Sequence, residues 1–338
     1  MSTPILIVNE LTTRLKIGNH DFKVLENISF KLYPGRTLAL VGESGCGKTL
    51  TALSIMRVLP QQALPSQGEV FYKDQNLLTI SEKEMRSIRG ARIAMIFQDP
   101  SSALNPVYTI GEQLLEVVEL HLNLYGNEAI ERVVTALNEV GIPSPRDRLS
   151  DYPHQLSGGM KQRVMIAMAL LCEPDILIAD EPTTALDVTI QAQVLDLIRG
   201  LQAKRGMALL LITHDMGVVA EMADDVIVMY AAQAVEKGDV FQIFDHMSHP
   251  YTMGLFQSRP TVTSARGALK AIKGTVPPVT HYPLGCRFHP RCPFVMPKCR
   301  QGNVPDFAIN ETKNHISKCW LYDGTEESAL RIIEKETA

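Results

Sequence analysis

Short, continuously hydrophobic runs recur along the first two thirds of the chain, separated by segments with helical periodicity. These runs occupy residues 37–41, 93–97, 176–179 and 208–213. Runs that are apolar throughout are typical of strands buried on both faces of a parallel sheet. The segment 189–203 predicts a helix between the last two runs, which makes that connection a βαβ unit. The pattern therefore indicates an α/β fold.

A helical insert is predicted between the second and third runs, over about residues 99–156. From Ile110 to Leu122 the apolar residues repeat at helical spacing, and they do so again over residues 130–140. Gly141 then ends the second helix. We expect a helical subdomain between the two halves of the α/β core.

The composition changes beyond about residue 245. Proline, histidine and cysteine become frequent there, and the periodicity fades until a final charged helix near residues 328–334. Four of the six cysteines lie in this part, with the spacing C-x5-C-x6-C-x19-C: Cys286, Cys292, Cys299 and Cys319. We therefore expect two domains, residues 1–245 and a small cysteine-rich module at residues 246–338.

The cysteine quartet has three interpretations. Four thiolates can complete a tetrahedral zinc site or hold a cubane iron–sulfur cluster, and the spacing matches neither the paired zinc knuckles nor the ferredoxin run. Free buried thiols are the third possibility. Spacing alone leaves these alternatives open.

Composition and charge exclude several other classes. Hydrophobic residues make up 45% and charged residues 21% of the 338, which excludes a disordered chain, and the net charge of −4 does not favour nucleic acid or an anionic membrane surface. No run approaches the about 18 apolar residues that cross a bilayer. The sequence starts without the basic and apolar regions of a secretory signal. These features favour the cytoplasm, where cysteines are seldom paired in disulfides.

The first hydrophobic run leads into a glycine-rich turn that matches the phosphate-binding pattern G-x-x-x-x-G-K-[ST]. In such a loop the backbone N–H groups cradle phosphate, the lysine reaches the β- and γ-phosphates, and the last hydroxyl binds Mg²⁺. The alternative is a structural glycine turn, which the placement between a strand and a helix makes the weaker interpretation. The residues are Gly42, Glu43, Ser44, Gly45, Cys46, Gly47, Lys48 and Thr49.

Acidic residues and a histidine follow the third and fourth runs. Asp180 and Glu181 close the third run, where the carboxyl ends of parallel strands form the ligand edge of a sheet. Asp180 would hold Mg²⁺ through water, and Glu181 could orient or deprotonate the attacking water. An acidic helix N-cap is the alternative. His214 follows the fourth run, and we expect it to contact the γ-phosphate.

A second anion site is predicted at Ser157, Gly158 and Gly159, which open a helix. A chain that already has a phosphate-binding loop does not need a second anion site for its own nucleotide. The second site is explained if it contacts a nucleotide bound by another subunit. The alternative is a helix cap followed by a tight turn.

Taken together, these motifs resemble the ATP-binding-cassette ATPases over residues 1 to about 245. The resemblance rests on the phosphate loop, Gln98 in FQDP, LSGGM at 156–160, ILIADE at 176–181, Ala185-Leu186-Asp187 and His214. It implies a head-to-tail dimer with ATP between one chain's phosphate loop and the other chain's Ser157, Gly158 and Gly159. It also implies that Gln98 senses the γ-phosphate and Mg²⁺, that Asp187 belongs to the nucleotide-binding set, and that the helical subdomain receives a coupling helix from a membrane subunit.

The adenine-stacking aromatic of that family has no obvious counterpart in this sequence. Leu15 stands at one plausible alignment of its position, and Phe22 is the nearest aromatic residue. Phe22 is therefore the predicted stacking residue.

The C-terminal module at residues 246–338, called the tail below, resembles the tail of the oligopeptide and dipeptide permease ATPase subunits, with the dipeptide branch nearest. This resemblance rests on His249-Pro250-Tyr251-Thr252, Pro277-Pro278 and GCRFHPRCP at 285–293. It implies ATP hydrolysis that energises import of di- or oligopeptides, at the cytoplasmic face of the bacterial inner membrane. It implies a second cassette ATPase (the same chain or another), two transmembrane permeases and an extracytoplasmic peptide-binding protein as partners, with no nucleic acid. It also implies a [4Fe–4S] cluster on the four tail cysteines.

Three alternatives stand beside this interpretation. Members of the same family could import nickel or antimicrobial peptides. A cassette ATPase acting on ribosomes or DNA is disfavoured by the single cassette and the acidic charge. A phosphoryl-transfer enzyme would leave the Ser157 motif and His214 unexplained.

Overall fold

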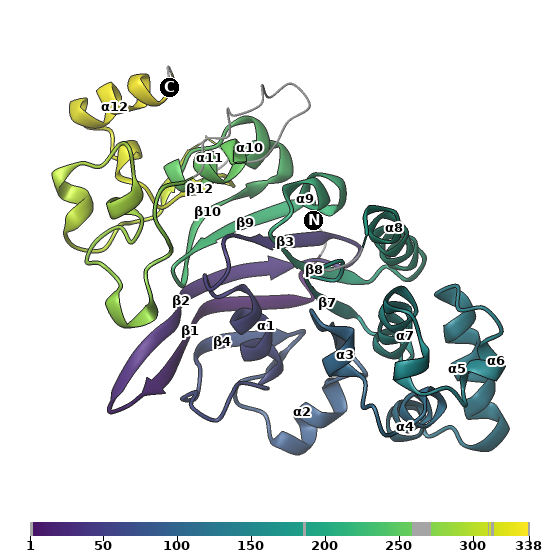
Figure 1. The fold of residues 1–338 in the computed structure, drawn as a ribbon. Coiled ribbons are helices and arrows are strands. Elements are labelled where there is room, and N and C mark those ends of the chain that lie inside the picture. The colour runs from purple at the N-terminus through teal and green to yellow at the C-terminus, as the bar shows by residue number, and fades with distance from the viewer. Residues whose placement is uncertain (1–2, 185–186, 259–271, 310, 312–313, 337–338) are drawn as a thin grey trace. The chain divides into compact units, whose positions relative to one another are not determined.

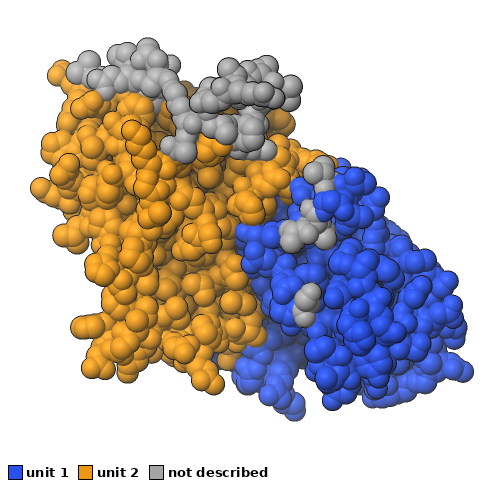
Figure 2. All heavy atoms as spheres, in the orientation of Figure 1, with its two compact units in different colours: residues 1–7, 31–37, 70–212 blue, residues 8–30, 38–69, 213–338 orange. Residues whose placement is uncertain are grey.

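The computed structural model describes residues 3–184, 187–258, 272–309, 311 and 314–336 (Figure 1). The chain divides into two compact units, each assembled from separated stretches (Figure 2). Unit 1 comprises residues 1–7, 31–37 and 70–212, and unit 2 comprises residues 8–30, 38–69 and 213–338.

The core of unit 1 is a set of parallel strands flanked by helices. β7 (Ile176–Asp180) pairs in parallel with β6 (Ile93–Ile96) on one side and β8 (Ala208–Thr213) on the other. Every residue of β7 and β8 is buried, which is why both runs are apolar throughout. α8 (Val188–Arg205) connects these two strands, so the predicted βαβ unit is confirmed.

The remaining elements of unit 1 include the helices predicted around residues 110–122 and 130–140. In α4, Thr109 and Glu112 form a capping box, which explains the sharp start of the helix. α4 and α5 contact each other, and both contact α7. The elements are β4 (Gln67–Tyr72), β5 (Gln75–Asn76), α2 (Glu82–Ile88), α3 (Pro100–Ala103), α4 (Ile110–Leu122), α5 (Gly126–Glu139), α6 (Pro145–Arg148), the 3-10 helix η1 (Pro153–Gln155) and α7 (Gly158–Leu170).

Unit 2 contains a mixed sheet that the tail extends. β3 (Thr37–Val41) pairs in parallel with β9 (Asp225–Tyr230), and β9 pairs antiparallel with β10 (Gln233–Asp239). The tail then adds β12 (Ile316–Ser317) to β10 and β11 (Phe307–Ala308) to β12, both antiparallel. Strands 225–239 and the tail thus share one sheet. The boundary predicted at residue 245 lies inside this unit and stays a prediction.

The other elements of unit 2 include two long strands that the hydrophobic pattern did not predict, β1 and β2. They are neighbours in a second sheet. The full set is β1 (Leu6–Ile17), β2 (His20–Leu32), α1 (Lys48–Met56), α9 (Met216–Met222), α10 (Val240–Asp245), α11 (Pro250–Gln257), η2 (Val279–His281), η3 (His289–Arg291), η4 (Pro297–Arg300), η5 (Trp320–Tyr322) and α12 (Glu326–Glu336). Among the described helices, none combines the length and the apolar character needed to cross a bilayer.

Candidate functional site

The predicted phosphate-binding loop joins β3 to α1 in unit 2, and its glycines are required by its shape. Gly42, Gly45 and Gly47 have φ of +149°, +79° and +111°, a region that other L-residues rarely adopt. A Cβ on Gly42 would lie 2.2 Å from the carbonyl oxygen of Met229, and one on Gly47 would lie 2.8 Å from Cδ2 of Leu25. The loop therefore closes directly onto β9, and only glycine fits at these two positions.

Lys48 is folded back into this loop. Its side chain is buried, and Nζ donates hydrogen bonds to the carbonyl oxygens of Gly42 at 2.8 Å and Glu43 at 3.1 Å. Ser44, Gly45 and Thr49 are exposed. An anion reaching the exposed side of the loop can take over the Lys48 ammonium from two neutral carbonyl groups, which are weaker acceptors than a charged oxygen.

Cys46 lies on the inner side of the same loop. Its side chain is fully buried, and burial raises the pKa of its thiol. The residue is therefore a protonated thiol that contributes packing to the loop rather than a reactive thiolate.

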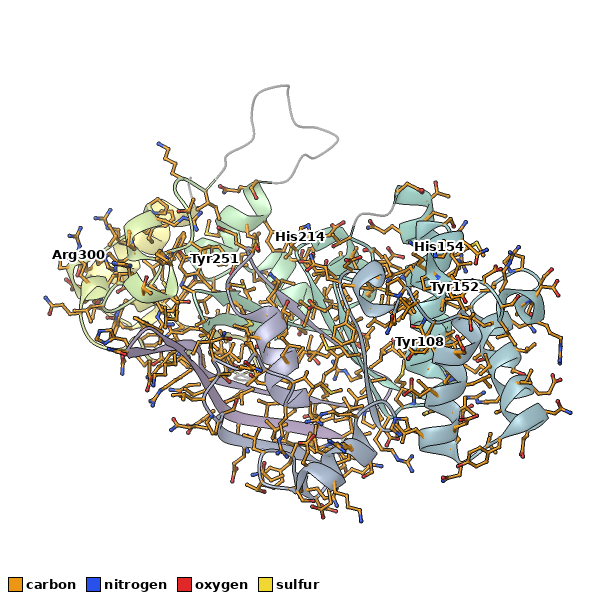
Figure 3. The ribbon with its side chains drawn as sticks, turned by 60° about the horizontal axis from the view of Figure 1, so that its bottom comes forward. Tyr108, Tyr152, His154, His214, Tyr251 and Arg300 are labelled. Carbon is orange, nitrogen blue, oxygen red and sulfur yellow. The ribbon has the colours of Figure 1, made fainter. Side chains whose placement is uncertain are left out.

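Two tail residues, missed by the sequence analysis, hold the second residue of the loop. The Tyr251 hydroxyl accepts a hydrogen bond of 2.8 Å from the backbone N–H of Glu43. Nη1 of Arg291 lies 3.1 and 3.2 Å from the two carboxylate oxygens of Glu43. Tyr251, labelled in Figure 3, is fully buried, and its ring centroid lies 4.7 Å from that of Tyr230. A sequence separation of more than 200 residues leaves no local signal for these contacts.

In unit 1 the structure brings Gln98 and Glu181 together. Oε2 of Glu181 accepts hydrogen bonds from Nε2 of Gln98 at 2.9 Å and from Oγ1 of Thr184 at 2.8 Å. The backbone of Glu181 has φ of +47°, and its N–H donates to the carbonyl oxygen of Ile212 at 2.8 Å. A left-handed conformation at a residue other than glycine costs about 1–3 kcal/mol and is typical of functional sites. Asp180 precedes it, buried at the end of β7.

A hydrogen bond ties α7 to the loop after Glu181. Gln162 is buried, and its Nε2 donates to the carbonyl oxygen of Pro182 at 2.6 Å. Gln162 and Thr184 could not be assigned a role from the sequence, because a lone polar residue next to a motif has no pattern of its own. Gln162 and Thr184 both form hydrogen bonds to Glu181 or to the residue that follows it.

Ser157 caps α7, as the alternative interpretation of this motif required. Its Oγ accepts a hydrogen bond of 3.3 Å from the backbone N–H of Met160. Ser157 and Gly158 are exposed, and a Cβ on Gly158 would meet no atom within 4 Å. The start of α7 therefore combines a helix cap with an open face at which a ligand could approach the backbone, so the two interpretations do not exclude each other.

The remaining predicted residues lie as follows. Asp187 caps α8, its Oδ1 accepting from the N–H of Ile190 at 3.0 Å. His214 is exposed directly after β8 (Figure 3). The ring of Phe22 packs edge-on against that of His20, with 6.3 Å between centroids. Ala185 and Leu186 lie outside the described residues.

Part of the helical region of unit 1 presents exposed apolar side chains. Val107, Tyr108 and Tyr152 have exposed fractions of 72%, 52% and 39%. The ring of Tyr152 stacks on that of His154 at 5.6 Å, and both are labelled in Figure 3. Exposed apolar side chains rimmed by polar residues are typical of a surface that contacts another protein.

The four tail cysteines surround one small enclosed cavity of about 10 Å³. Its other walls are mostly apolar and include Phe288, Phe294 and Met296. Burial raises the pKa of Cys286 to about 11 and that of Cys292 to about 12, so both are thiols when no cation is near. In the described part of the chain no group of three or more Cys, His, Asp or Glu side chains is placed to hold a metal ion. The predicted metal site is thus not shown.

Comparison with known proteins identifies the class of protein that this fold and these motifs define. The family model "ABC transporter" matches residues 25–184. The dimeric structure of the ATP-binding cassette MJ0796 in a post-hydrolysis state, bound to ADP and Pi, has a TM-score of 0.62 and 25% identity, covering 70% of this chain and 98% of that one. The cbiO1 structure from Clostridium perfringens, part of the transporter complex cbiONQ, has a TM-score of 0.61 and 28% identity, covering 72% and 91%.

The tail narrows the class. The family model "Oligopeptide/dipeptide transporter, C-terminal region" matches residues 235–299. The dipeptide transport ATP-binding protein DppD of Bacillus subtilis (strain 168) is 48% identical over 327 residues, 96% of this chain and 97% of that protein. A probable peptide ABC transporter ATP-binding protein, y4tR, of Sinorhizobium fredii is 47% identical over 94% of each chain. The chain belongs to the ABC transporter ATPases with an oligopeptide/dipeptide transporter C-terminal region.

Proposed function

We propose that this chain is the ATP-hydrolysing subunit of an importer for dipeptides or oligopeptides in a bacterial cytoplasmic membrane. The observation that carries the proposal is the 48% identity over 96% of the chain to a dipeptide-transport ATP-binding protein. That match includes the tail, where the oligopeptide/dipeptide family model also matches. Import of nickel or of antimicrobial peptides is the alternative within the family.

In the proposed cycle the phosphates of ATP bind to the loop at residues 42–49. The backbone N–H groups and the start of α1 favour negative charge there. Lys48 exchanges the carbonyl oxygens of Gly42 and Glu43 for phosphate oxygens. Mg²⁺, when bound, neutralises charge on the phosphates. Thr49, Gln98 and Asp180 would be its protein ligands, directly or through water.

Glu181 is the proposed general base, which takes a proton from the water that attacks the γ-phosphate. Oε2 of Glu181 accepts hydrogen bonds from Gln98 and Thr184, and these hydrogen bonds orient the carboxylate. His214 contacts the γ-phosphate in this proposal. Each subunit of the dimer completes its partner's site with Ser157, Gly158 and Gly159. ATP binding closes the dimer and hydrolysis reopens it.

Two transmembrane permeases are the proposed partners on the membrane side. Val107, Tyr108 and Tyr152 offer them an apolar surface on the helical region of unit 1. The chain would then lie peripherally at the cytoplasmic face of the membrane. An extracytoplasmic peptide-binding protein would act through the permeases.

We further propose that the tail cysteines hold a [4Fe–4S] cluster, with zinc as the alternative. The support for this proposal is the residue type, four cysteines, and their shared lining of one cavity with mostly apolar walls; their side chains would have to move together to hold the group. Without a cation the same burial disfavours the thiolates, as the raised pKa of Cys286 and Cys292 reflects. When bound, such a group would connect residues 286–319 and stabilise a segment that has little regular structure of its own.

Co-purification from native membranes tests the importer assignment. Tagged Glu181→Gln protein would be extracted in mild detergent with ATP, and Lys48→Ala protein would serve as the control that binds ATP poorly. We expect two multi-span permeases and a cassette ATPase by mass spectrometry. Ribosomal or DNA-associated partners with no membrane protein would contradict the assignment.

A further inference from the structure

A cavity of about 280 Å³ opens beside the phosphate-binding loop in unit 2, and tail residues form much of its wall. Ser44 and Gly45 of the loop line it, so a group bound there is continuous with phosphates held by the loop. Its volume is close to the lower end of the about 300–1,000 Å³ typical of small-molecule sites.

The walls of this cavity are mainly apolar and include one aromatic ring. β2 contributes Val24, and α1, the helix that follows the loop, contributes Leu50. The tail contributes the segment 276–279, with the sequence Val-Pro-Pro-Val, and Tyr282. An apolar slot with one aromatic ring, adjoining an anion site, has the chemistry that a nucleobase attached to a phosphate chain requires.

Tyr282 is held in place by neighbouring groups. The guanidinium of Arg287 lies over its ring, 4.3 Å from the centroid. Arg287 is itself bound by the carboxylate of Glu26 and the carbonyl oxygen of Ala231. A ring that is already positioned loses little conformational entropy when a ligand stacks on it.

We propose that the tail forms the base-binding part of the nucleotide site, with Tyr282 as the aromatic side chain that contacts adenine. The proposal rests on the ATP-binding function and extends it by assigning base recognition to the tail. Leu15, which stands at one plausible alignment of the family's stacking position, has no π-face to offer a base. Phe22, the residue predicted from sequence, is not among the described residues that line this cavity.

Nucleotide binding by the purified chain tests the proposal, measured by calorimetry with ATP and with inorganic tripolyphosphate. Tripolyphosphate has the phosphates but no base, so comparing the two ligands separates the contribution of base contacts to affinity from that of the phosphate-binding loop. Tyr282→Ala should weaken ATP binding about 5- to 150-fold, the range expected for loss of one base-stacking contact. Tripolyphosphate binding should stay unchanged. The matched control is Tyr282→Phe, which keeps the ring and should bind ATP like the wild type.

Two results would overturn the proposal. In one, Tyr282→Ala binds ATP as tightly as the wild type. In the other, it loses ATP and tripolyphosphate in equal measure, which would place the effect on the loop or the fold. Wild-type protein that binds neither ligand would refute the ATP-binding function itself, a distinct outcome from either of these.

Discussion

The contact between Tyr251 and the phosphate-binding loop gives the sharpest prediction about how the tail supports nucleotide binding. Tyr251→Phe removes one oxygen atom and keeps the ring in a fully buried site. That oxygen accepts the N–H of Glu43 at 2.8 Å. Its loss leaves this partly buried N–H without the acceptor, at a cost of about 1–3 kcal/mol.

The expected shift in melting temperature follows from that cost. Large domains lose about 2–4 °C per kcal/mol, and for a chain of this size we use about 2 °C, so the variant should melt about 2–6 °C lower. Differential scanning calorimetry measures the shift, and calorimetric titration should show weaker ATP binding by the same variant. The loop would lose part of the ordering that ATP binding requires.

Tyr230→Phe is the matched control. Tyr230 is also fully buried, but its hydroxyl oxygen lies 3.4 Å from Nη1 of Arg291, too far for a strong hydrogen bond. We expect a much smaller shift in melting temperature than for Tyr251→Phe. Equal shifts for the two variants, or no shift for Tyr251→Phe, would refute the reasoning that the tail hydroxyl stabilises the loop.

Four further predictions concern the proposed general base Glu181, the start of α7, the buried carboxylate of Glu236 and the tail cysteines. Glu181→Gln should bind ATP normally but lower turnover on the order of 10²-fold or more, whereas turnover close to wild type would remove Glu181 from the mechanism. Gly158→Ala should leave the melting temperature unchanged, because the added Cβ meets no atom within 4 Å. The same variant should impair ATP-dependent dimerisation, measured by light scattering. Normal dimerisation would contradict a role of Gly158 at the subunit interface. Glu236→Ala should destabilise the protein by about 3–5 kcal/mol in chemical denaturation. The buried carboxylate of Glu236 accepts hydrogen bonds from the backbone N–H groups of Ser248 and His249 and lies 2.9 Å from Nε2 of His315. A loss under 1 kcal/mol would show that these contacts are replaceable. Cys292→Ser should lower the iron and sulfide content, or the zinc content, and the melting temperature, while Cys172→Ser, outside the quartet, should change neither; equal metal content in both variants would argue against the cysteine site.

The core of unit 1 could be predicted from the sequence because its strands are buried on both faces. All residues of β7 and β8 are buried, so their hydrophobic runs mark the strands almost to the residue. β1 and β2 could not be found in this way. Neither strand is buried throughout or alternates regularly between buried and exposed residues, and polar residues such as Asn9 and Glu26 interrupt the hydrophobic pattern.

The residues of the candidate site also differ in how far they could be predicted from the sequence. Residues in local motifs, such as Lys48 and Glu181, were predictable because the chemistry needs a particular side chain at a particular spacing. Tyr251, Arg291 and Tyr282 reach the region of the phosphate loop from a tail more than 200 residues away, through contacts that only the folded chain creates. No periodicity or spacing in the sequence encodes such contacts.

Peptide uptake in cells tests the central claim, that ATP hydrolysis by this chain energises import. Cells deleted for the chain would be supplied with the wild type or with Glu181→Gln, and accumulation of a radiolabelled dipeptide would be followed over time. We predict that the wild type restores uptake and that Glu181→Gln, expressed at the same level, does not. Equal uptake with both proteins, or no dependence of uptake on the chain at all, would contradict the account.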